Sequence, residues 1–434
     1  MENDNEQTAL PYHPSHESHL LRVQNDGFEI DPDEKYLPEE FPKVIESPLV
    51  WKGEEVAATP ERWILQLSKD DVDEIKGAME VFLDTGALFK EISPATFSLS
   101  PELRERLAKL RDSLYDGLGF GLIKGLNSRD YTMKENIVIH AGLTSYFGSK
   151  RGYMGAQGND VLAHIRNIQQ HFPGQDIVSP SFTNAAMTFH TDLGDIVSIF
   201  TASKGTSGGA FRIASAWNVY NVLRATRPDV LRTLSQPFVF DTLHPDIPSY
   251  QKPLLHFHAG RVLLQSFRRP FTGFGGTARS DTLPALSSAQ KLALDTLHFA
   301  ALNSSLTINF ADGDLCVFNN LALLHARDQH ESPSTSHSES HPESAPAPAS
   351  VSVSAPESTF ATTSASESGE ASARHLLKMF VRDDDAERAW SIPPVVQDQW
   401  DELYGSRTDP RTEDFPFDYP RGGTVPNYGW SQNG

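Results

Sequence analysis

Several short apolar runs beyond Gly194 constrain the fold of the chain more than any other feature. They are rich in β-branched and aromatic residues, are too short for typical helices, and are separated by turn residues such as the ADGD at 311–314. The runs are DIVSIFTA (195–202), RVLLQSF (261–267), SLTINF (305–310), LCVFNN (315–320) and HLLKMFV (375–381). This succession predicts a β sandwich or barrel with inserted helices.

A low-complexity tract of Ser, Pro, Ala and Glu at 331–371 separates the last of these runs from the others. Such a composition buries too little apolar surface to offset the entropy of ordering, so we expect a disordered insert. The entropic cost of closing a loop grows by only about 0.6 kcal/mol per doubling of length, so a domain tolerates the insert. We therefore predict one domain over 46–395, a polar tail at 1–45 and a C-terminal tail at 396–434.

The first half of the predicted domain carries helix signals. Ser68 begins a capping box, and Ser100 with Pro101 begins a second helix that ends near Gly117. Both segments place apolar residues on one helical face. The run GFGLIKGL at 119–126 predicts a strand, and a further helix is expected over 134–146.

Charge and cysteine content narrow the classes of partner. The chain has 434 residues and a formal net charge of −20, which would repel nucleic acid and anionic membranes. Its acidic start is unlike a secretory signal, and no apolar run has transmembrane length. The single cysteine, Cys316, excludes an intramolecular disulfide and a cysteine-rich zinc site, and it fits a reducing compartment. We expect a cytoplasmic protein with a small-molecule substrate and neither nucleic acid nor membrane as partner; the oligomeric state, a homo-oligomer included, stays open.

The motif His190-Thr191-Asp192 precedes a strand-like run, and side chains two apart on a strand share a face. The similar motifs at 244–246 and 341–343 contain proline and lack such a run, so we expect no metal there. A ferrous site needs a second histidine, for which His325 is the best candidate. From spacing alone, the alternative that these histidines are structural stays open.

Arg374, Lys378 and Arg382 fall on one face of the run that follows the insert. That face could point to solvent. If it points inward, the guanidinium of Arg374 could hold a carboxylate with two parallel hydrogen bonds.

The blocks HTD, GDL…NN…HAR and RHL occur in an order that resembles the TauD/TfdA-like family of iron(II)/2-oxoglutarate dioxygenases, in the version common among fungal proteins. The resemblance runs from about Tyr36 to Ile392. It implies an α+β fold with a double-stranded β-helix (jelly-roll) core and flanking and inserted helices.

The resemblance also implies a catalytic metal site. His190, Asp192 and His325 would hold Fe(II), with 2-oxoglutarate and O2 as co-substrates and succinate and CO2 as products. Arg374 would pair with the far carboxylate of 2-oxoglutarate. Because the insert precedes Arg374, Arg327 is the runner-up for this role.

Three further residues are candidates for the substrate side of the site. Lys378 lies four residues after Arg374, where a cation suggests an anionic substrate such as an amino acid, carboxylate or sulfonate. His164 lies in a block that resembles the substrate-side loop of the family. Phe211 occupies a position where the family often has Ser or Thr in contact with 2-oxoglutarate, which is a departure from the pattern.

Two other classes of function compete with the oxygenase. One is a non-catalytic barrel that acts as a binding or scaffold protein, and the other is a zinc barrel metalloenzyme that needs no 2-oxoglutarate. Among the remaining residues, we expect His256 to be structural, His330 to be solvated, Cys316 to face the core, and Asp195 to belong to a turn or to support the metal ligands.

Overall fold

The structure is a computed structural model that describes residues 10–31, 35–154, 159–242, 249–331, 373–383, 385, 388–405 and 413–417. The tract at 331–371, predicted to be a disordered insert, lies outside the described residues except for its first residue. Within the described residues, no helix is both long and apolar enough to cross a membrane.

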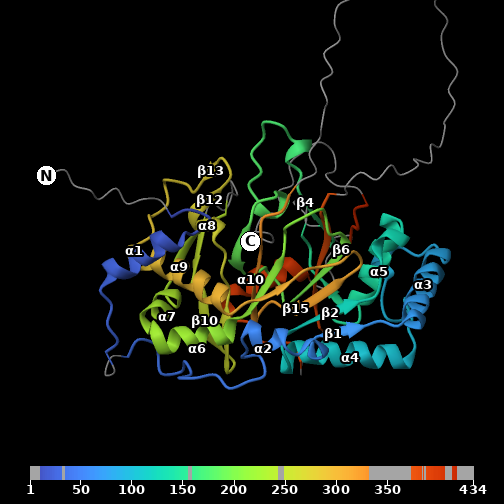
Figure 1. Ribbon diagram of the computed structural model, residues 1–434, viewed down its shortest axis with the longest axis horizontal. Coiled ribbons are helices and arrows are strands. Elements are labelled where there is room, and N and C mark those ends of the chain that lie inside the picture. The colour runs from blue at the N-terminus through green and yellow to red at the C-terminus, as the bar shows by residue number, and fades with distance from the viewer. Residues whose placement is uncertain are drawn as a thin grey trace, which may run out of the picture.

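Two sheets form the centre of the fold, with helices outside them (Figure 1). The larger sheet has seven strands: β1 (Ile64–Gln66), β2 (Phe120–Lys124), β15 (Leu315–Asn319), β6 (Ile196–Ser203), β17 (His375–Arg382) and β3 (Lys150–Arg151) in that order, with β4 (Ala163–Arg166) also paired to β17. The smaller sheet has the order β14 (Leu306–Ile308), β7 (Phe211–Ser215), β16 (Leu323–Arg327), β5 (Met187–His190). The β1–β2 pair is parallel and the other pairs are antiparallel.

Three two-stranded pairs lie outside these sheets. They are β8 (Phe238–Asp241) with β9 (Ser249–Lys252), β10 (Leu255–His258) with β11 (Arg261–Leu264), and β12 (Gly273–Phe274) with β13 (Thr277–Ala278).

Helices cover the two sheets on opposite sides of the molecule (Figure 1). The α-helices are α1 (His16–Asp26), α2 (Gly53–Ala57), α3 (Lys69–Asp84), α4 (Pro101–Asp116), α5 (Met133–Thr144), α6 (Ala216–Thr226), α7 (Pro228–Leu234), α8 (Arg269–Thr272), α9 (Ser288–Asn303) and α10 (Gln397–Tyr404). Short 3₁₀ helices lie at Pro60–Arg62, Phe89–Glu91, Ser128–Asp130, Gln169–His171, Pro180–Phe182 and Pro394–Val396. Helices α4 and α5 pack on the larger sheet, whereas α6 and α9 pack on the smaller one.

Local sequence signals account for α3, α4, α5 and six of the strands. Ser68 caps α3 through the predicted capping box, and the Ser100 hydroxyl accepts from the Leu103 amide at the start of α4. The predicted strand at 119–126 contains β2, and the helix expected over 134–146 is α5. Each of the apolar runs named above contains a strand. The predictions of these elements are confirmed.

The predicted tail at 1–45 is wrong for much of its length. Helix α1 docks through Arg22, which pairs with the buried Asp295 of α9 at 2.5 Å, and Tyr36 and Phe41 are buried. The helix buries none of its own residues fully, so apolar periodicity does not reveal it; ion pairs hold it instead.

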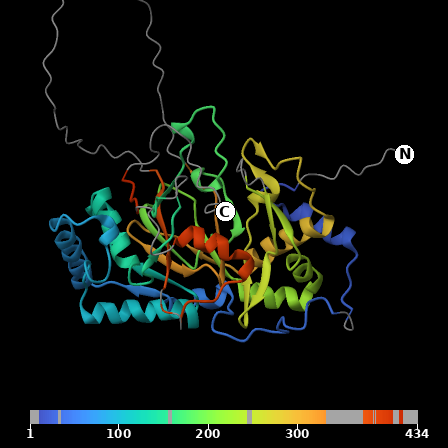
Figure 2. The same ribbon diagram turned by 180° about the vertical axis from the view of Figure 1, so that it is seen from behind.

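The C-terminal tail predicted from residue 396 is also wrong where the structure describes it. Helix α10 crosses the middle of the molecule in the rear view (Figure 2). Its Trp400 is 1% exposed and donates to Asp195 at 2.5 Å, and the Tyr404 hydroxyl accepts from the Asp195 amide at 2.9 Å. The helix therefore clamps the connection between β5 and β6.

Candidate metal centre

Two neighbouring strands of the smaller sheet bring His190 and His325 together. Strands β5 and β16 are antiparallel with His190 opposite His325, and their ring centroids lie 4.1 Å apart. Residues that face each other across an antiparallel pair have adjacent side chains. The pairing of β5 with β16 therefore brings together two histidines that are far apart in the sequence.

Asp192 lies in the connection that leads from β5 to β6. The motif was expected to open the strand of the run at 195–202. Instead, His190 ends β5 in the smaller sheet, and β6 begins at Ile196 in the larger one. Gly194 has φ of 95°, a conformation that glycine adopts without strain, and it turns the chain between the sheets. His190 and Asp192 converge because of this turn and not because they share a strand.

The three side chains form a compact buried group. His190, Asp192 and His325 each offer one ligand-type atom, and these atoms all lie within 4.8 Å of one another. The Asp192 carboxylate approaches the Nε2 of His325 to 3.6 Å and the Nε2 of His190 to 4.0 Å. Their exposed fractions are 1%, 1% and 6% in the order of sequence, so bulk water does not solvate them.

Hydrogen bonds around the group set its orientation. The Nδ1 of His190 donates to the Thr188 carbonyl at 2.7 Å, which directs the Nε2 lone pair inward, where this atom has no hydrogen-bond partner among the described residues. The Asn320 side chain holds the turn at 192–194 with three hydrogen bonds. Its Oδ1 accepts from the Asp192 amide at 2.8 Å, and its Nδ2 donates to the carbonyls of Asp192 and Gly194. The sequence analysis missed this role of Asn320, although the two asparagines at 319–320 that end the run LCVFNN were its signal.

Burial keeps both histidines neutral near pH 7. Desolvation lowers the pKa of His190, with partial compensation from the Asp192 carboxylate. Desolvation, reinforced by His190 and Lys378, lowers the pKa of His325 well below its usual value. Neutral imidazoles offer lone pairs, which is the form that a metal ion needs.

A cavity beside this group draws residues from both sheets. His190, His325 and Phe211 come from the smaller sheet, whereas Ile199, Leu376 and Lys378 come from the larger one. The ring of Phe211 stacks on Phe310 and lies 5.8 Å from the ring of His325.

Lys378 contacts the candidate metal ligands themselves. Its ammonium donates to the Oδ2 of Asp192 at 3.0 Å, and its side chain is 6% exposed. The Lys378 side chain therefore points inward from β17. This is the inward of the two orientations considered for the face that carries Arg374, Lys378 and Arg382.

Arg374 and Arg327 also line the cavity but differ in their partners. Arg374 donates to the Gly209 carbonyl at 3.3 Å, a weak contact for a group with several donors. Burial, followed by the neighbouring charge of Arg327, lowers the pKa of Arg374 to about 9. Gly209 has φ of 69°, and a Cβ there would lie 2.8 Å from the Nε of Arg374, so the glycine makes room for the guanidinium.

The guanidinium of Arg327 is already occupied. It donates to backbone carbonyls of the segment at 180–185, at distances of 3.0, 2.9 and 2.6 Å to Pro180, Thr183 and Ala185. These bonds hold the segment that precedes β5.

His164 does not line the cavity, which corrects the expectation for this residue. In the β4–β17 pair, Ile165 faces Leu376 on the cavity side, so alternation places His164 on the opposite face. There its Nδ1 lies 2.8 Å from the Nε2 of His375, and its Nε2 donates to the Pro416 carbonyl at 2.8 Å.

The other singled-out residues are mostly buried. Cys316 is fully buried, as predicted, and His256 is 7% exposed. His330 was expected to be solvated and is 3% exposed, so that expectation is wrong. Burial raises the pKa of Asp195 to about 6, and the carboxylate accepts from Trp400 and lies 3.5 Å from Arg382. The motifs at 244–246 and 341–343 lie outside the described residues.

Comparisons with known proteins converge on one family. The family model described as "Taurine catabolism dioxygenase TauD, TfdA family" matches residues 85–339, a range that includes all three members of the buried group but not Arg374. A taurine hydroxylase-like protein, SAT17 of Stachybotrys chartarum, is 30% identical over 361 residues, covering 82% of this chain and 84% of that protein.

Two more distant matches follow. FR-33289 synthase of Streptomyces rubellomurinus is 23% identical over 227 residues, covering 51% of this chain and 66% of that protein. The non-heme iron oxygenase OrfP, in a structure with Fe, succinate and (3S)-hydroxy-L-Arg, has a TM-score of 0.50 at 11% identity, covering 75% of this chain and 95% of that one. The likeness to OrfP concerns the fold.

The buried histidines predict acid sensitivity of the metal-free protein. Burial lowers the pKa of His140 and His298 to about 3 and that of His256 to about 4, whereas histidine in an unfolded chain titrates near pH 6.5. Below about pH 6.5 the unfolded state binds more protons, so the free energy of unfolding should fall as the pH falls. Asp195 has the opposite effect because its pKa is raised in the folded state, so that the folded protein binds one additional proton there as the pH falls.

Urea unfolding in the presence of a chelator, between about pH 7.5 and pH 5, measures the effect because most carboxyl groups titrate below this window. His140→Gln should make the dependence of the free energy of unfolding on pH shallower. A free energy that stays constant or rises towards pH 5 would contradict the prediction.

Proposed function

The chain belongs to the TauD/TfdA family of iron(II)- and 2-oxoglutarate-dependent dioxygenases, and we propose that it oxidises a small anionic metabolite with O2 while 2-oxoglutarate becomes succinate and CO2. The observation that carries the proposal is the buried group of His190, Asp192 and His325 beside a cavity that contains a poorly partnered arginine. We also propose that the two sheets form a double-stranded β helix within a single catalytic domain.

The residues present fit iron(II). Two imidazoles and one carboxylate on one side of a metal leave the opposite positions open, which is the ligand set of non-heme iron oxygenases. The unpartnered Nε2 of His190 and the Nδ1–carbonyl bond behind it are what a ligating histidine requires. When bound, iron supplies the oxygen-activating redox chemistry that no side chain provides.

We assign Arg374 as the partner of the far carboxylate of 2-oxoglutarate. A buried guanidinium is costly unless an anion pairs with it, and Arg374 has one long hydrogen bond to a neutral carbonyl. Arg327, the runner-up, spends its hydrogen bonds on the segment at 180–185 and is assigned a structural role. Phe211 offers the cavity a ring and no hydroxyl, so its contribution is apolar contact with the carbon chain of the co-substrate.

We assign Lys378 two tasks. Its ammonium holds the Oδ2 of Asp192, the oxygen that also approaches His325, while Oδ1 lies towards His190. Its charge favours an anionic head group on the substrate. Taurine, which the family description and the fungal relative name, is an amino sulfonate and supports this substrate class. The stem of Lys378 excludes water from the Asp192 carboxylate.

Replacing a member of the metal-binding group should abolish turnover. His190→Ala and Asp192→Ala should each remove substrate-stimulated formation of succinate in a screen of amino acids, sulfonates and small carboxylates. Each should also remove the weak visible band expected when iron(II) and 2-oxoglutarate are added without oxygen. His258→Ala, a histidine outside the cavity that contacts Ser391, is the matched control and should keep both signals.

The same experiment separates the alternatives. A wild-type protein that binds no iron(II) and forms no succinate would support a non-catalytic barrel. Activity with zinc that persists without oxygen would support a metalloenzyme of another kind. Circular dichroism of the variants checks that the fold is retained, which we expect because the core is large.

Arg374 and Arg327 should respond differently to loss of charge. Arg374→Gln should raise the KM for 2-oxoglutarate by about 10- to 100-fold, since a charged hydrogen bond is worth about 1.5–3 kcal/mol. Arg327→Gln should mainly lower the free energy of unfolding, because it leaves buried carbonyls without donors. Steady-state kinetics and urea unfolding measure the two effects, and a larger KM effect at Arg327 would reverse the assignment.

Lys378 should act on the substrate more than on the co-substrate. Lys378→Met removes the charge and keeps most of the volume, so the KM for the substrate found in the screen should rise much more than the KM for 2-oxoglutarate. Affinity for Mn(II), measured by its electron paramagnetic resonance signal, should change as well because Asp192 loses its partner. Equal changes in the two KM values would contradict the substrate role.

A further inference from the structure

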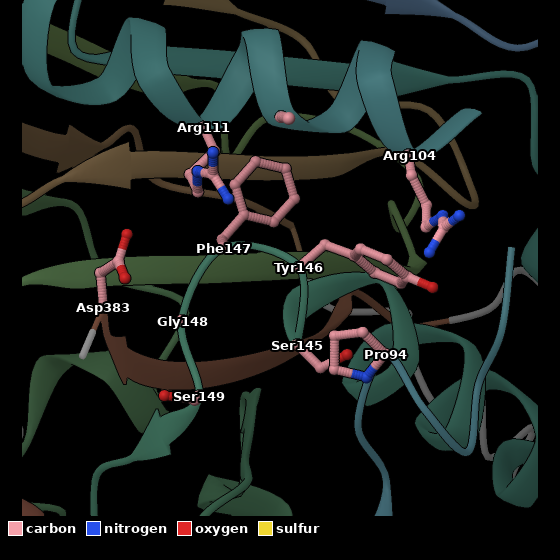
Figure 3. Close-up of a pocket in the computed structure, with 10 residues that line it drawn as sticks. Pro94, Arg104, Arg111, Ser145, Tyr146, Phe147, Gly148, Ser149 and Asp383 are labelled. Carbon is pink, nitrogen blue, oxygen red and sulfur yellow. The ribbon is translucent and has the colours of Figure 1, made fainter. Parts of the chain in front are cut away.

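A second cavity lies at the far end of β17 from the candidate metal centre. It has a volume of about 350 Å³ and lies between α4 and the loop that follows α5, with Asp383 at one side (Figure 3). Lys378 and Asp383 are five residues apart on an extended chain, so the two cavities are separated by about 17 Å along the strand. We call this space the α4 cavity; it is lined by Pro94, Arg104, Ala108, Arg111, 145–149 and Asp383.

Two arginines of one helix reach into the α4 cavity. Arg104 and Arg111 are seven residues apart on α4, which is about two turns, so both side chains leave the same face of the helix. Figure 3 shows both guanidinium groups on the cavity side, with the Tyr146 ring towards Arg104 and the Phe147 ring beside Arg111. The cavity therefore combines a positive wall with aromatic surface.

The charges around the α4 cavity do not cancel. Arg111 pairs with Asp112 at 2.9 Å, and Asp383 is held by Arg388 at 2.7 Å. Beyond the helical bond of its backbone amide to the Ser100 carbonyl, Arg104 has no partner among the described residues for its guanidinium. Arg104 is exposed to solvent, so its guanidinium is open to a ligand that enters the cavity, in a chain whose formal net charge is −20.

The neutral polar groups of the α4 cavity are already satisfied. The Tyr146 hydroxyl donates to the Phe97 carbonyl at 2.7 Å and accepts from the Leu99 amide at 3.1 Å, while the Ser145 hydroxyl donates to the Gly142 carbonyl. These bonds fix the shape of the cavity wall and leave the guanidinium of Arg104, and the Nη1 of Arg111, whose Nε and Nη2 donate to Asp112, to meet a ligand. A guanidinium matches carboxylate and phosphate oxygens in a planar, two-point geometry.

We propose that the α4 cavity binds a small organic anion, with its carboxylate or phosphate on Arg104 and Arg111 and its apolar body against Tyr146, Pro94 and Ala108. The site does not depend on the proposed oxygenase function, because it shares no residue with the metal centre. Carboxylates and phosphates offer the same chemistry to a guanidinium, so the experiment includes both.

Benzoate and phenyl phosphate are the probes, and benzyl alcohol is the neutral control of similar shape. Titrations use the protein loaded with iron(II) and saturated with 2-oxoglutarate without oxygen, so that the cavity at the metal centre is filled. At least one anion should bind with a Kd below about 1 mM, and benzyl alcohol should bind on the order of tenfold more weakly. Failure of both anions to saturate, or equal binding of benzyl alcohol, would overturn the proposal.

Variants on α4 locate the bound anion. Arg104→Gln should weaken binding by about 10- to 100-fold, and the double variant with Arg111→Gln should abolish it. Lys109→Gln removes a charge from the same helix outside the cavity, where Lys109 pairs with Glu105, and should leave the Kd unchanged. Ala108→Phe fills the cavity without a change of charge and should abolish binding; unaltered binding in Arg104→Gln or Ala108→Phe would overturn the proposal.

Discussion

A buried carboxylate at the crossing between two sheets is the constraint on which the candidate metal centre depends. Asp192 is 1% exposed, and a carboxylate removed from water is stable only with cations or hydrogen-bond donors around it. Lys378 of β17 meets this need with a charged hydrogen bond to the Asp192 carboxylate, and the neutral His325 of β16 lies 3.6 Å from the same oxygen. Asn320 fixes the turn that carries the carboxylate, so the position of Asp192 does not depend on a flexible loop.

The balance of charge in the cavity explains which ligands it favours. Arg327, Arg374 and Lys378 bring three cations to the cavity, none of whose described lining residues is a carboxylate, and Asp192 pairs with Lys378 at its edge. Arg327 disperses its charge over backbone carbonyls, but Arg374 lacks such compensation. A dianionic co-substrate supplies the negative charge that the buried guanidinium of Arg374 lacks, whereas a neutral molecule would leave that guanidinium unpaired. The preference for an anion is thus a consequence of desolvation and not only of geometry.

The sequence predicts the parts of this protein that depend on local periodicity or on order along the chain. The strands β2, β6, β11, β14, β15 and β17 and the helices α3 to α5 follow from apolar spacing and capping residues. The order of the blocks that contain His190, Asp192, His325 and Arg374 led, through the family resemblance, to the candidate site. Prediction from the sequence fails for elements and side-chain orientations that tertiary contacts determine. Helix α1 is held by an ion pair to Asp295 of α9 and another to Arg227, and it buries no residue fully. The face on which His164 lies depends on the register of β4 against β17. A shift of one residue in that register would have turned His164 into the cavity.

Strand β17 connects the two candidate sites. Its residues Leu376 and Lys378 face the metal-site cavity, and the chain then leaves the sheet at Arg382 and Asp383 beside the α4 cavity. The separation along the strand is about 17 Å, so the charged groups of the two sites are not in direct contact. Any influence of one site on the other would have to pass through movement of β17, whose packing against β6 and α5 resists displacement.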